Sequence, residues 1–208
     1  MIVFAGAKRK IKRLNDKYTG KCYIASSANA WMNEELTKSW VQNVLGRLLF
    51  TGQRLLAWDA CRCHLADTVR EELRISRVDT VIIPGGCTKY IQEPDVSQNK
   101  PFKKYIREKY DEWMAGGIHE FTVNGNMRGP PREKMVDWIL AAWDSFDRQL
   151  VIDFFKSCAL TVATDGSEDA EIHCLKPSQP CAAGLDQLKR LNHVHYEERR
   201  SFRETNTV

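Results

Sequence analysis

The chain alternates between short apolar runs and longer segments in which apolar residues recur every three or four positions. The short runs predict strands at Ile2–Ala5, 22–25, Arg54–Trp58 and Asp79–Ile83. The periodic segments predict helices at 33–48, 66–75, 97–114 and 133–143, followed by another helix that carries Leu150, Val151, Phe154 and Phe155. Strands that alternate with helices in this way are typical of an α/β fold with parallel neighbouring strands.

Three polar segments divide the chain. Residues 8–21 hold seven basic residues against Asp16 alone, and this segment is predicted to be a basic loop after the first strand. Residues 115–131 are rich in glycine and end in two prolines, which predicts a loop or boundary. After Gly184 the sequence turns polar, as in a frayed helix with a disordered end. The predicted parts are therefore residues 1–131, a helical extension at 132–184, and a polar tail at 185–208.

Two carboxylates follow predicted strands, where α/β folds usually place their chemistry. Asp59 ends the strand that begins at Arg54, and Asp95 comes just after the next strand, 36 positions later. The carboxyl ends of parallel strands lie at one edge of a sheet, so both side chains are expected there. Close carboxylates repel unless a cation lies between them, and a two-ion site of hard divalent cations would suit in-line displacement at a phosphodiester. The alternative is that both aspartates simply cap helices.

Three sequence blocks around these aspartates resemble the DDE superfamily domain of pogo/Tigger-like transposases. The blocks are Trp58–Leu65, Ile83–Thr88 and Pro94–Lys103. Segments at 2–6, 29–32 and 165–169 are also similar to that family, so the resemblance extends over roughly residues 1–184. It implies an α/β fold of the RNase H-like type found in DDE integrases and transposases, incomplete in this chain and followed by C-terminal helices.

The resemblance also implies a catalytic metal site of three acidic residues that bind Mg²⁺ or Mn²⁺. Asp59 matches the second of these residues and Asp95 the third, which makes them the predicted catalytic and metal-binding residues. In the family the first acidic residue lies on a strand before the segment that matches 2–6, so it would fall before Met1. The family sheet has three antiparallel strands leading into two parallel ones, with that strand in the middle. We therefore expect negligible cleavage or transfer of DNA strands by this chain alone.

Lysines and arginines gather in two segments and predict a nucleic-acid surface. The predicted contacts are Lys8, Arg9, Lys10, Lys12 and Arg13 in the first segment and Lys100, Lys103 and Lys104 in the second. Neutralising phosphates releases counterions and gives affinity that does not depend on base sequence. The resemblance implies that the partner is DNA and that the protein is nuclear. The alternative is that both segments are solvated charged surfaces.

Composition and length narrow the class of protein. Hydrophobic residues make up 43% of the 208 positions and charged residues 28%, which is ordinary for a soluble protein. The longest apolar run, Trp138–Trp143, is far shorter than the ~20 residues that a membrane-spanning helix needs. Seven cysteines at irregular spacing indicate reduced thiols in the cytosol or nucleus.

Other clusters of metal-binding or nucleophilic residues are weaker candidates. Cys61, Cys63 and His64 lie together, but their spacing is not that of a structural zinc site and no second cysteine pair answers them. A Cys61–His64 nucleophile pair has no orienting group in the sequence. His193 and His195 are alternate residues in a polar tail, and the acidic segment 165–171 lacks the ligand pattern of an EF-hand.

The sequence thus favours a transposase-derived DDE domain that is catalytically inactive alone and retains affinity for DNA. A second hypothesis is a non-catalytic interaction module whose C-terminal aromatic helices recruit protein partners. A third is an inert remnant that does not accumulate as folded protein. Charge reversal at Lys8, Arg9, Lys10 and Arg13 separates the first two hypotheses, because only DNA binding depends on those charges.

Overall fold

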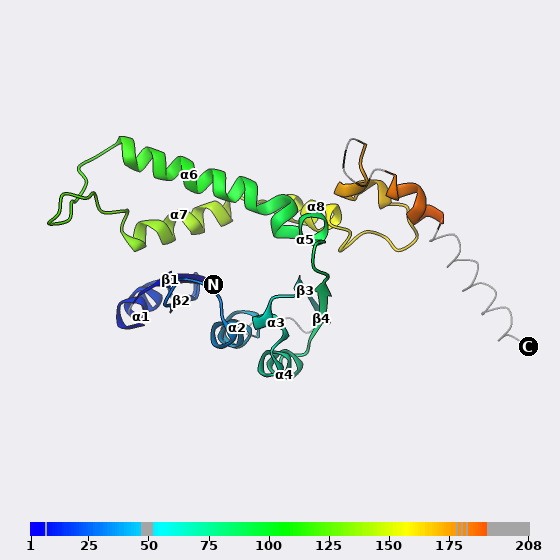
Figure 1. Cartoon of the computed structure of the whole chain (residues 1–208), viewed down its shortest axis with the longest axis horizontal. Coiled ribbons are helices and arrows are strands. Elements are labelled where there is room, and N and C mark those ends of the chain that lie inside the picture. The colour runs from blue at the N-terminus through cyan, green and yellow to red at the C-terminus, as the bar shows by residue number, and fades with distance from the viewer. Residues whose placement is uncertain (7, 47–51, 178, 180, 182, 191–208) are drawn as a thin grey trace, which may run out of the picture. The chain divides into compact units, whose positions relative to one another are not determined.

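The computed structural model describes residues 1–6, 8–46, 52–177, 179, 181 and 183–190 (Figure 1). The chain forms two compact units. Unit 1 contains Met1–Gly85 and Phe102–Ser145, and unit 2 contains Gly86–Pro101 and Phe146–Val208. Asp59 therefore belongs to unit 1 and Asp95 to unit 2.

The first part of unit 1 is a small parallel sheet with a helical connection. Strand β1 (Ile2–Ala5) pairs in parallel with β2 (Ile24–Ser27), with Ile2 opposite Ile24 and Ala5 opposite Ser27. Helix α1 (Lys8–Lys17) connects the two strands. The prediction of a loop in this segment is wrong. Its apolar residues Ile11, Leu14 and Tyr18 recur at helical spacing, and their burial stabilises a helix despite the high charge of the segment.

Helix α7 (Arg132–Asp144) completes the core around α1. Val136 packs with Ile11, Leu14, Tyr18 and Ile24. The Tyr18 hydroxyl donates to Asp137 Oδ1 at 2.8 Å, and it also lies 3.1 Å from the Glu133 carbonyl oxygen. Arg132 Nη2 donates to the Ala5 carbonyl oxygen at 2.6 Å. Residues separated by more than one hundred positions are thus held together by both apolar and polar contacts.

Replacing Tyr18 by phenylalanine should weaken this packing and change its response to alkali. Burial, followed by the hydrogen bond to Asp137, raises the pKa of Tyr18 from 10.0 to about 12. Because the folded pKa exceeds the ordinary value, the hydroxyl's contribution is complete below pH 10 and is lost as the pH rises towards 12. We expect Tyr18→Phe to cost ~1 kcal/mol at pH 8, and to remove part of the alkaline loss of stability.

Urea unfolding at pH 8 and across the alkaline range measures both effects. Tyr110→Phe is the matched control, because Tyr110 is 39% exposed. Equal stability of Tyr18→Phe and the parent chain at every pH would contradict the account of this contact.

The second part of unit 1 carries the first predicted catalytic aspartate. Helix α2 (Glu34–Trp40) begins after Asn33, whose Oδ1 accepts from the Leu36 amide at 2.9 Å, and it continues into the π-helix η1 (Val41–Leu45). The predicted helix extended to Leu48, which lies outside the described residues. The elements that follow are β3 (Arg54–Asp59), α3 (Arg62–Leu65), α4 (Asp67–Ile75) and β4 (Val78–Ile83).

Strands β3 and β4 form a parallel ladder in which Arg54 lies opposite Val78 and Asp59 opposite Ile83. Leucine and valine side chains of α4 and η1 cover one face of this ladder. The buried cluster consists of Val41, Trp58, Val69, Leu73 and Val78. This core holds the strand that ends at Asp59 against two helical segments.

Arg54 closes the opposite end of the ladder. Its Nη1 donates to the Leu45 carbonyl oxygen at 2.9 Å, and its Nη2 donates to the Ser76 carbonyl oxygen. The last carbonyl groups of a helix lack intrahelical partners and carry partial negative charge. One guanidinium therefore satisfies carbonyl groups at the ends of both η1 and α4.

Helix α6 (Asn99–Ala115) confirms the helix predicted at 97–114, and it begins in unit 2 and continues into unit 1. The predicted loop at 115–131 is confirmed, because residues 116–131 form no helix and no strand. Their regular backbone pairing is one isolated antiparallel bridge between Phe121 and Met127. Helix α7 confirms the helix predicted at 133–143.

Unit 2 is mostly helical in its described residues. Its elements are α5 (Thr88–Ile91), the π-helix η2 (Pro94–Gln98), α8 (Arg148–Ser157), the short 3₁₀ helices η3 (Asp169–Glu171) and η4 (His173–Leu175), and a helix over 184–190. Ser97 Oγ lies 3.1 Å from Ser157 Oγ, which joins η2 to α8. Lys156 Nζ pairs with Glu168 Oε1 and fastens the following loop to α8.

The chain is a mixed α/β protein with two small parallel sheets. The antiparallel strands implied by the resemblance are not present among the named strands of the described residues, because α1 returns the chain to β2 in the same direction as β1. The division at residues 131 and 184 stays a prediction. No helix within the described ranges is both long and apolar enough to cross a membrane.

Candidate metal centre and nucleic-acid surface

Asp59 lies at the carboxyl end of β3 with one carboxylate oxygen engaged and the other free. Its Oδ1 accepts from the Cys61 amide at 3.1 Å, and His64 Nδ1 lies 2.8 Å from the same oxygen. Its Oδ2 makes no hydrogen bond to the described residues. The side chain is 39% exposed, so the free oxygen is accessible to a cation. This donor suits a hard divalent ion.

His64 is a partner of Asp59 that the sequence analysis missed. Its ring stacks on the indole of Trp58 with the ring centroids 4.1 Å apart and the planes 5° apart. Trp58 is buried and packs against Trp40. The contact arises because α3 begins immediately after β3 and returns His64 to the strand end, which sequence spacing alone did not indicate. The aromatic stack therefore fixes the imidazole beside the carboxylate.

Asp95 lies within the π-helix η2 of unit 2. Its Oδ1 accepts from Asn99 Nδ2 at 2.8 Å, and its side chain is exposed. Its Oδ2, like that of Asp59, makes no hydrogen bond to the described residues. Each aspartate thus keeps one free oxygen for a metal ion. Their separation stays a prediction because they belong to different units.

Glu93 is a buried carboxyl close to Asp95 in sequence. It is 7% exposed, its Oε1 has no hydrogen-bond partner in the described residues, and burial raises its pKa. Burial also raises the pKa of Cys158 to about 11, and the charge of Glu93 acts in the same direction. Glu93 is therefore buried, whereas Asp95 is exposed to solvent.

No group of three histidine, cysteine, aspartate or glutamate side chains converges on one point within the part of the chain that the structure describes. Cys61 Sγ and Cys63 Sγ lie 3.1 Å apart, while His64 Nδ1 faces Asp59. His193 and His195 lie outside the described residues. The role of Asp59 and Asp95 as ligands of Mg²⁺ or Mn²⁺ stays a prediction, and carboxylate oxygens are donors that suit these ions.

The predicted basic segment is one face of α1. Lys12 and Arg13 are exposed, as is Lys17, whereas Ile11 and Leu14 are buried. The side chains of Lys8, Arg9 and Lys10 lie outside the described part of the structure. Helix geometry therefore separates the described cations of α1 from its apolar face.

An open cavity of about 630 Å³ lies where α1 meets the start of α7. Its lining consists of Arg13, Leu14, Lys17, Arg132 and Glu133. Three cations and one carboxylate therefore surround it. Arg13 is one of the predicted contacts and Lys17 lies in the same predicted basic segment, whereas Arg132 was not predicted. Only the packing of α7 on α1 brings Arg132 to this place.

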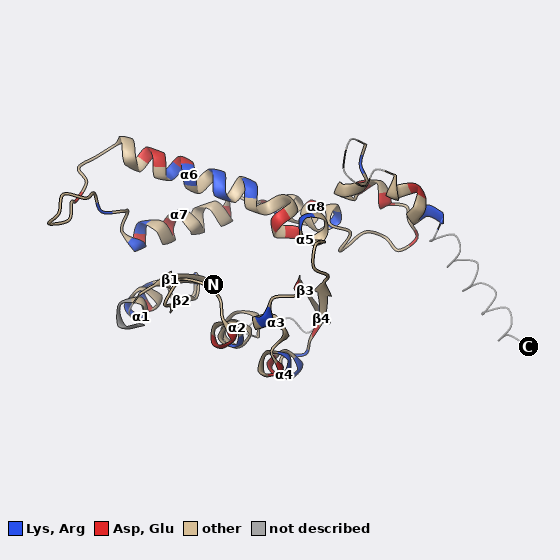
Figure 2. Cartoon of the chain, in the orientation of Figure 1, with Lys and Arg blue, Asp and Glu red and all other residues tan. Residues whose placement is uncertain are grey.

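The second predicted basic segment lies on α6. Lys100, Lys103 and Lys104 are exposed, and Lys104 Nζ lies 3.7 Å from Glu108 Oε1. In Figure 2 the lysines and arginine of the first turns precede the acidic residues along α6. The beginning of α6 is thus more basic than its end.

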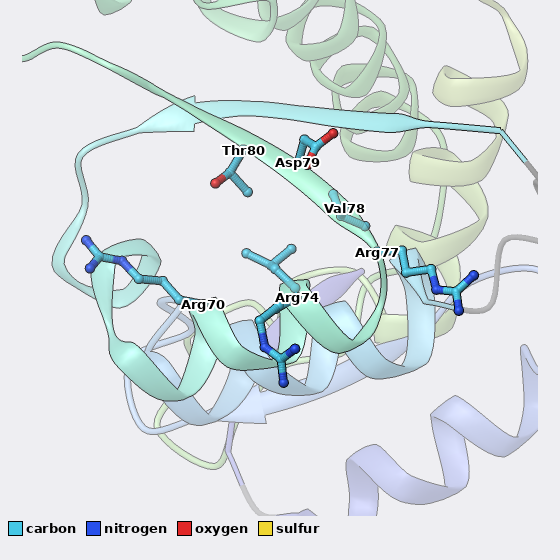
Figure 3. A pocket seen from close by; sticks show the side chains of 7 residues that line it. Arg70, Arg74, Arg77, Val78, Asp79 and Thr80 are labelled. Atoms are coloured by element: carbon cyan, nitrogen blue, oxygen red, sulfur yellow. The ribbon is translucent and has the colours of Figure 1, made fainter.

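A further cavity of about 280 Å³ lies between α4 and β4, and its lining includes Arg70, Arg74 and Arg77 (Figure 3). Glu71 binds the Arg74 guanidinium through both carboxylate oxygens, at 2.7 and 2.8 Å. Asp67 Oδ1 lies 3.8 Å from Arg70 Nη1. Figure 3 shows the three guanidinium groups pointing in different directions. Two of its three guanidinium groups therefore have a carboxylate partner within 4 Å.

Comparison with known proteins identifies the family. The family model described as "DDE superfamily endonuclease" matches residues 1–155. The chain belongs to this family. The match includes both Asp59 and Asp95, and DDE membership implies an RNase H-like fold, divalent metal ions and DNA as the nucleic acid.

Two curated relatives are similar to this DDE domain. "Pogo transposable element with KRAB domain" of Mus musculus is 30% identical over 169 residues, and the protein of the same name from Homo sapiens is 31% identical over 158 residues. These alignments cover 79% and 74% of the chain but only 28% and 26% of the two relatives. The chain therefore spans about a quarter of their length. No solved structure matches it.

Proposed function

We propose that this DDE domain is a transposase-derived, nuclear DNA-binding domain. In this proposal, Asp59 and Asp95 each bind Mg²⁺ or Mn²⁺, and the basic residues of α1 and α6 contact the DNA backbone. Family membership supports DNA as the partner. The free oxygens of the two aspartates support their role as metal ligands.

The basic face of α1 carries this proposal most directly. Arg13 and Lys17 are one helical turn apart on the exposed side of α1, and Arg132 joins them across an open cavity. A phosphate group placed there would lie near three cations. Cations that neutralise a DNA phosphate release the counterions bound to it, and this release favours binding. The half-buried Arg132 is held by Ala5, so it is ordered before DNA arrives.

We propose further that residues 1–208 alone do not cleave DNA. A magnesium ion requires about six oxygen ligands in near-octahedral geometry, and a two-ion mechanism needs carboxylates that hold both ions. Asp59 and Asp95 supply two carboxylates. Two carboxylates would leave most of the coordination positions of two ions to water, which would not hold both ions in place for cleavage.

A protein-interaction module is the second candidate function. Helix α8 exposes apolar side chains on its surface, namely Leu150, Ile152 and Phe155, each between 37% and 39% exposed. Burial of such side chains against a partner is favourable. This role does not depend on the cations of α1, so DNA binding distinguishes the two proposals.

Fluorescence anisotropy with the purified 208-residue chain and a labelled DNA duplex tests the first proposal. We expect the chain to bind DNA at low salt. The logarithm of the binding constant should fall linearly with the logarithm of the salt concentration, with a slope of about −0.9 for each phosphate contacted. Incubation with Mg²⁺ should leave a supercoiled plasmid intact. Absence of binding at low salt would favour the interaction module, and magnesium-dependent nicking lost in Asp59→Asn would contradict the proposed lack of cleavage.

A further inference from the structure

Cys61 and Cys63 form a close thiol pair beside the candidate metal ligand. Their Sγ atoms lie 3.1 Å apart, and neither thiol is in a disulfide. Cys61 is exposed at the position before α3, whereas Cys63 lies buried in the first turn of that helix. A disulfide bond is about 2.05 Å long. The two sulfur atoms therefore need to approach by only ~1 Å to form one.

The same pair is connected to Asp59 through the backbone. The Cys61 amide donates to Asp59 Oδ1 at 3.1 Å, and Nδ1 of His64, the residue after Cys63, lies 2.8 Å from the same oxygen. Drawing Cys61 towards Cys63 moves the amide that holds Oδ1. A covalent change at the thiols is thus transmitted to the carboxylate over a very short path.

We propose that Cys61 and Cys63 are a redox-sensitive modification site that closes into a reversible disulfide and alters the hydrogen bonding of Asp59. The effect on metal binding rests on the function proposed above for Asp59. The effect on the Asp59–His64 contact is independent of that function.

A peroxide is the oxidant that fits this geometry. The exposed Cys61 sulfur attacks one peroxide oxygen, the O–O bond breaks, and a sulfenic acid forms as water leaves. The Cys63 sulfur then attacks the Cys61 sulfur, the S–O bond breaks, and a second water leaves. Two thiols lose two electrons in total and the peroxide gains them. A dithiol reductant reverses the step by thiol–disulfide exchange.

The bond should be easy to reduce. Only Arg62 separates the two cysteines, so the disulfide closes a small ring at the start of α3. Strained and exposed disulfides have more oxidising potentials than structural ones and are the labile, regulatory class. This lability matches a switch rather than a permanent crosslink.

Peptide mapping of the intact 208-residue chain tests the disulfide directly. Trypsin cleaves after Arg54, Arg62 and Arg70, which places Cys61 and Cys63 on separate peptides. After hydrogen peroxide treatment and alkylation, we expect the peptides 55–62 and 63–70 to be joined and two hydrogen atoms lighter than their sum. Dithiothreitol should separate them. Overoxidation of Cys61 with Cys63 still a free thiol would overturn the proposal.

Two variants provide the controls. Cys61→Ser should abolish the joined peptides. Cys174→Ser should leave them unchanged, although Cys174 also has a neighbouring cysteine in unit 2, since the Cys181 amide donates to the Cys174 carbonyl oxygen at 3.0 Å. Joined peptides that disappear in Cys174→Ser would show that the crosslink depends on rearrangement elsewhere, and would contradict a local switch.

NMR of the His64 ring in metal-free protein tests the link to Asp59. We expect the imidazole signals of the parent chain to shift on oxidation and to return on reduction, with no shift in Cys61→Ser. A disulfide that forms without moving these signals would overturn the proposed link. Failure of the reduced chain to bind Mn²⁺ would instead contradict the function proposed for Asp59, which keeps the two tests separate.

Discussion

Reversing the charges of Lys12, Arg13 and Lys17 to glutamate should weaken DNA binding more than ~100-fold at about 0.1 M salt. Each phosphate contact contributes ~0.9 to the slope of the logarithm of affinity against the logarithm of salt concentration. Loss of one contact therefore lowers the affinity roughly eightfold at about 0.1 M salt. Loss of three contacts and the added repulsion therefore exceed a hundredfold. The salt slope should also fall by about 3 units.

The fold should survive these substitutions because the buried face of α1 is untouched. Ile11, Leu14 and Tyr18 remain in the core with Val136. A neutral version with glutamine at the three positions separates loss of attraction from added repulsion, and circular dichroism checks the helix content of both.

A matched control carries the same change of charge in unit 2. Arg148, Lys176 and Lys189 are exposed and lie outside the proposed DNA surface, so their reversal to glutamate should reduce affinity far less. Equal losses in the two variants would show that only total charge matters. That result would contradict a specific role for α1.

Trp58→Ala should cost about 3–5 kcal/mol of the free energy of unfolding and disorder the Asp59 site. Trp58 is 7% exposed and lies in the cluster formed with Val41, Val69, Leu73 and Val78. Its removal leaves a cavity beneath β3 and deprives His64 of its stacking partner. Strand β3 should therefore become less stable, and the imidazole of His64 should lose its fixed orientation.

Trp58→Phe is the matched comparison. The Trp58 Nε1 atom is buried without a hydrogen-bond partner in the described residues, so phenylalanine loses little polar interaction. We expect this variant to lose much less stability and to keep the His64 stack. Urea unfolding followed by circular dichroism measures both variants. Similar stability of Trp58→Ala and Trp58→Phe would show that the indole is not packed as described.

Much of the local structure follows from sequence patterns. The apolar stripe of 133–143 predicts α7 to within one residue at each end, and the apolar run before Asp59 predicts β3. The sequence predicts a loop in place of helix α1 because the high positive charge of this segment outweighs the helical spacing of its three apolar residues. Sequence patterns predict an element correctly where the spacing of apolar residues is the dominant signal, and they fail where the charge of a segment and its apolar spacing indicate different structures.

The candidate site was only partly visible in sequence. The aspartates stand out by their motif blocks, whereas His64 and Arg132 gain their roles from packing. His64 meets Asp59 through the tight connection between β3 and α3, and Arg132 reaches α1 because α7 packs there. The separation of Asp59 and Asp95 depends on tertiary arrangement, which 36 positions of sequence do not specify.

Manganese titration monitored by amide NMR tests the central claim that Asp59 and Asp95 are ligands of divalent cations. Paramagnetic broadening should reach saturation at the amides of both aspartates. Asp59→Asn should abolish the broadening at position 59, and Asp95→Asn should abolish the broadening at position 95. Absence of saturable broadening at either aspartate, or broadening that survives the substitution at its own position, would contradict this claim.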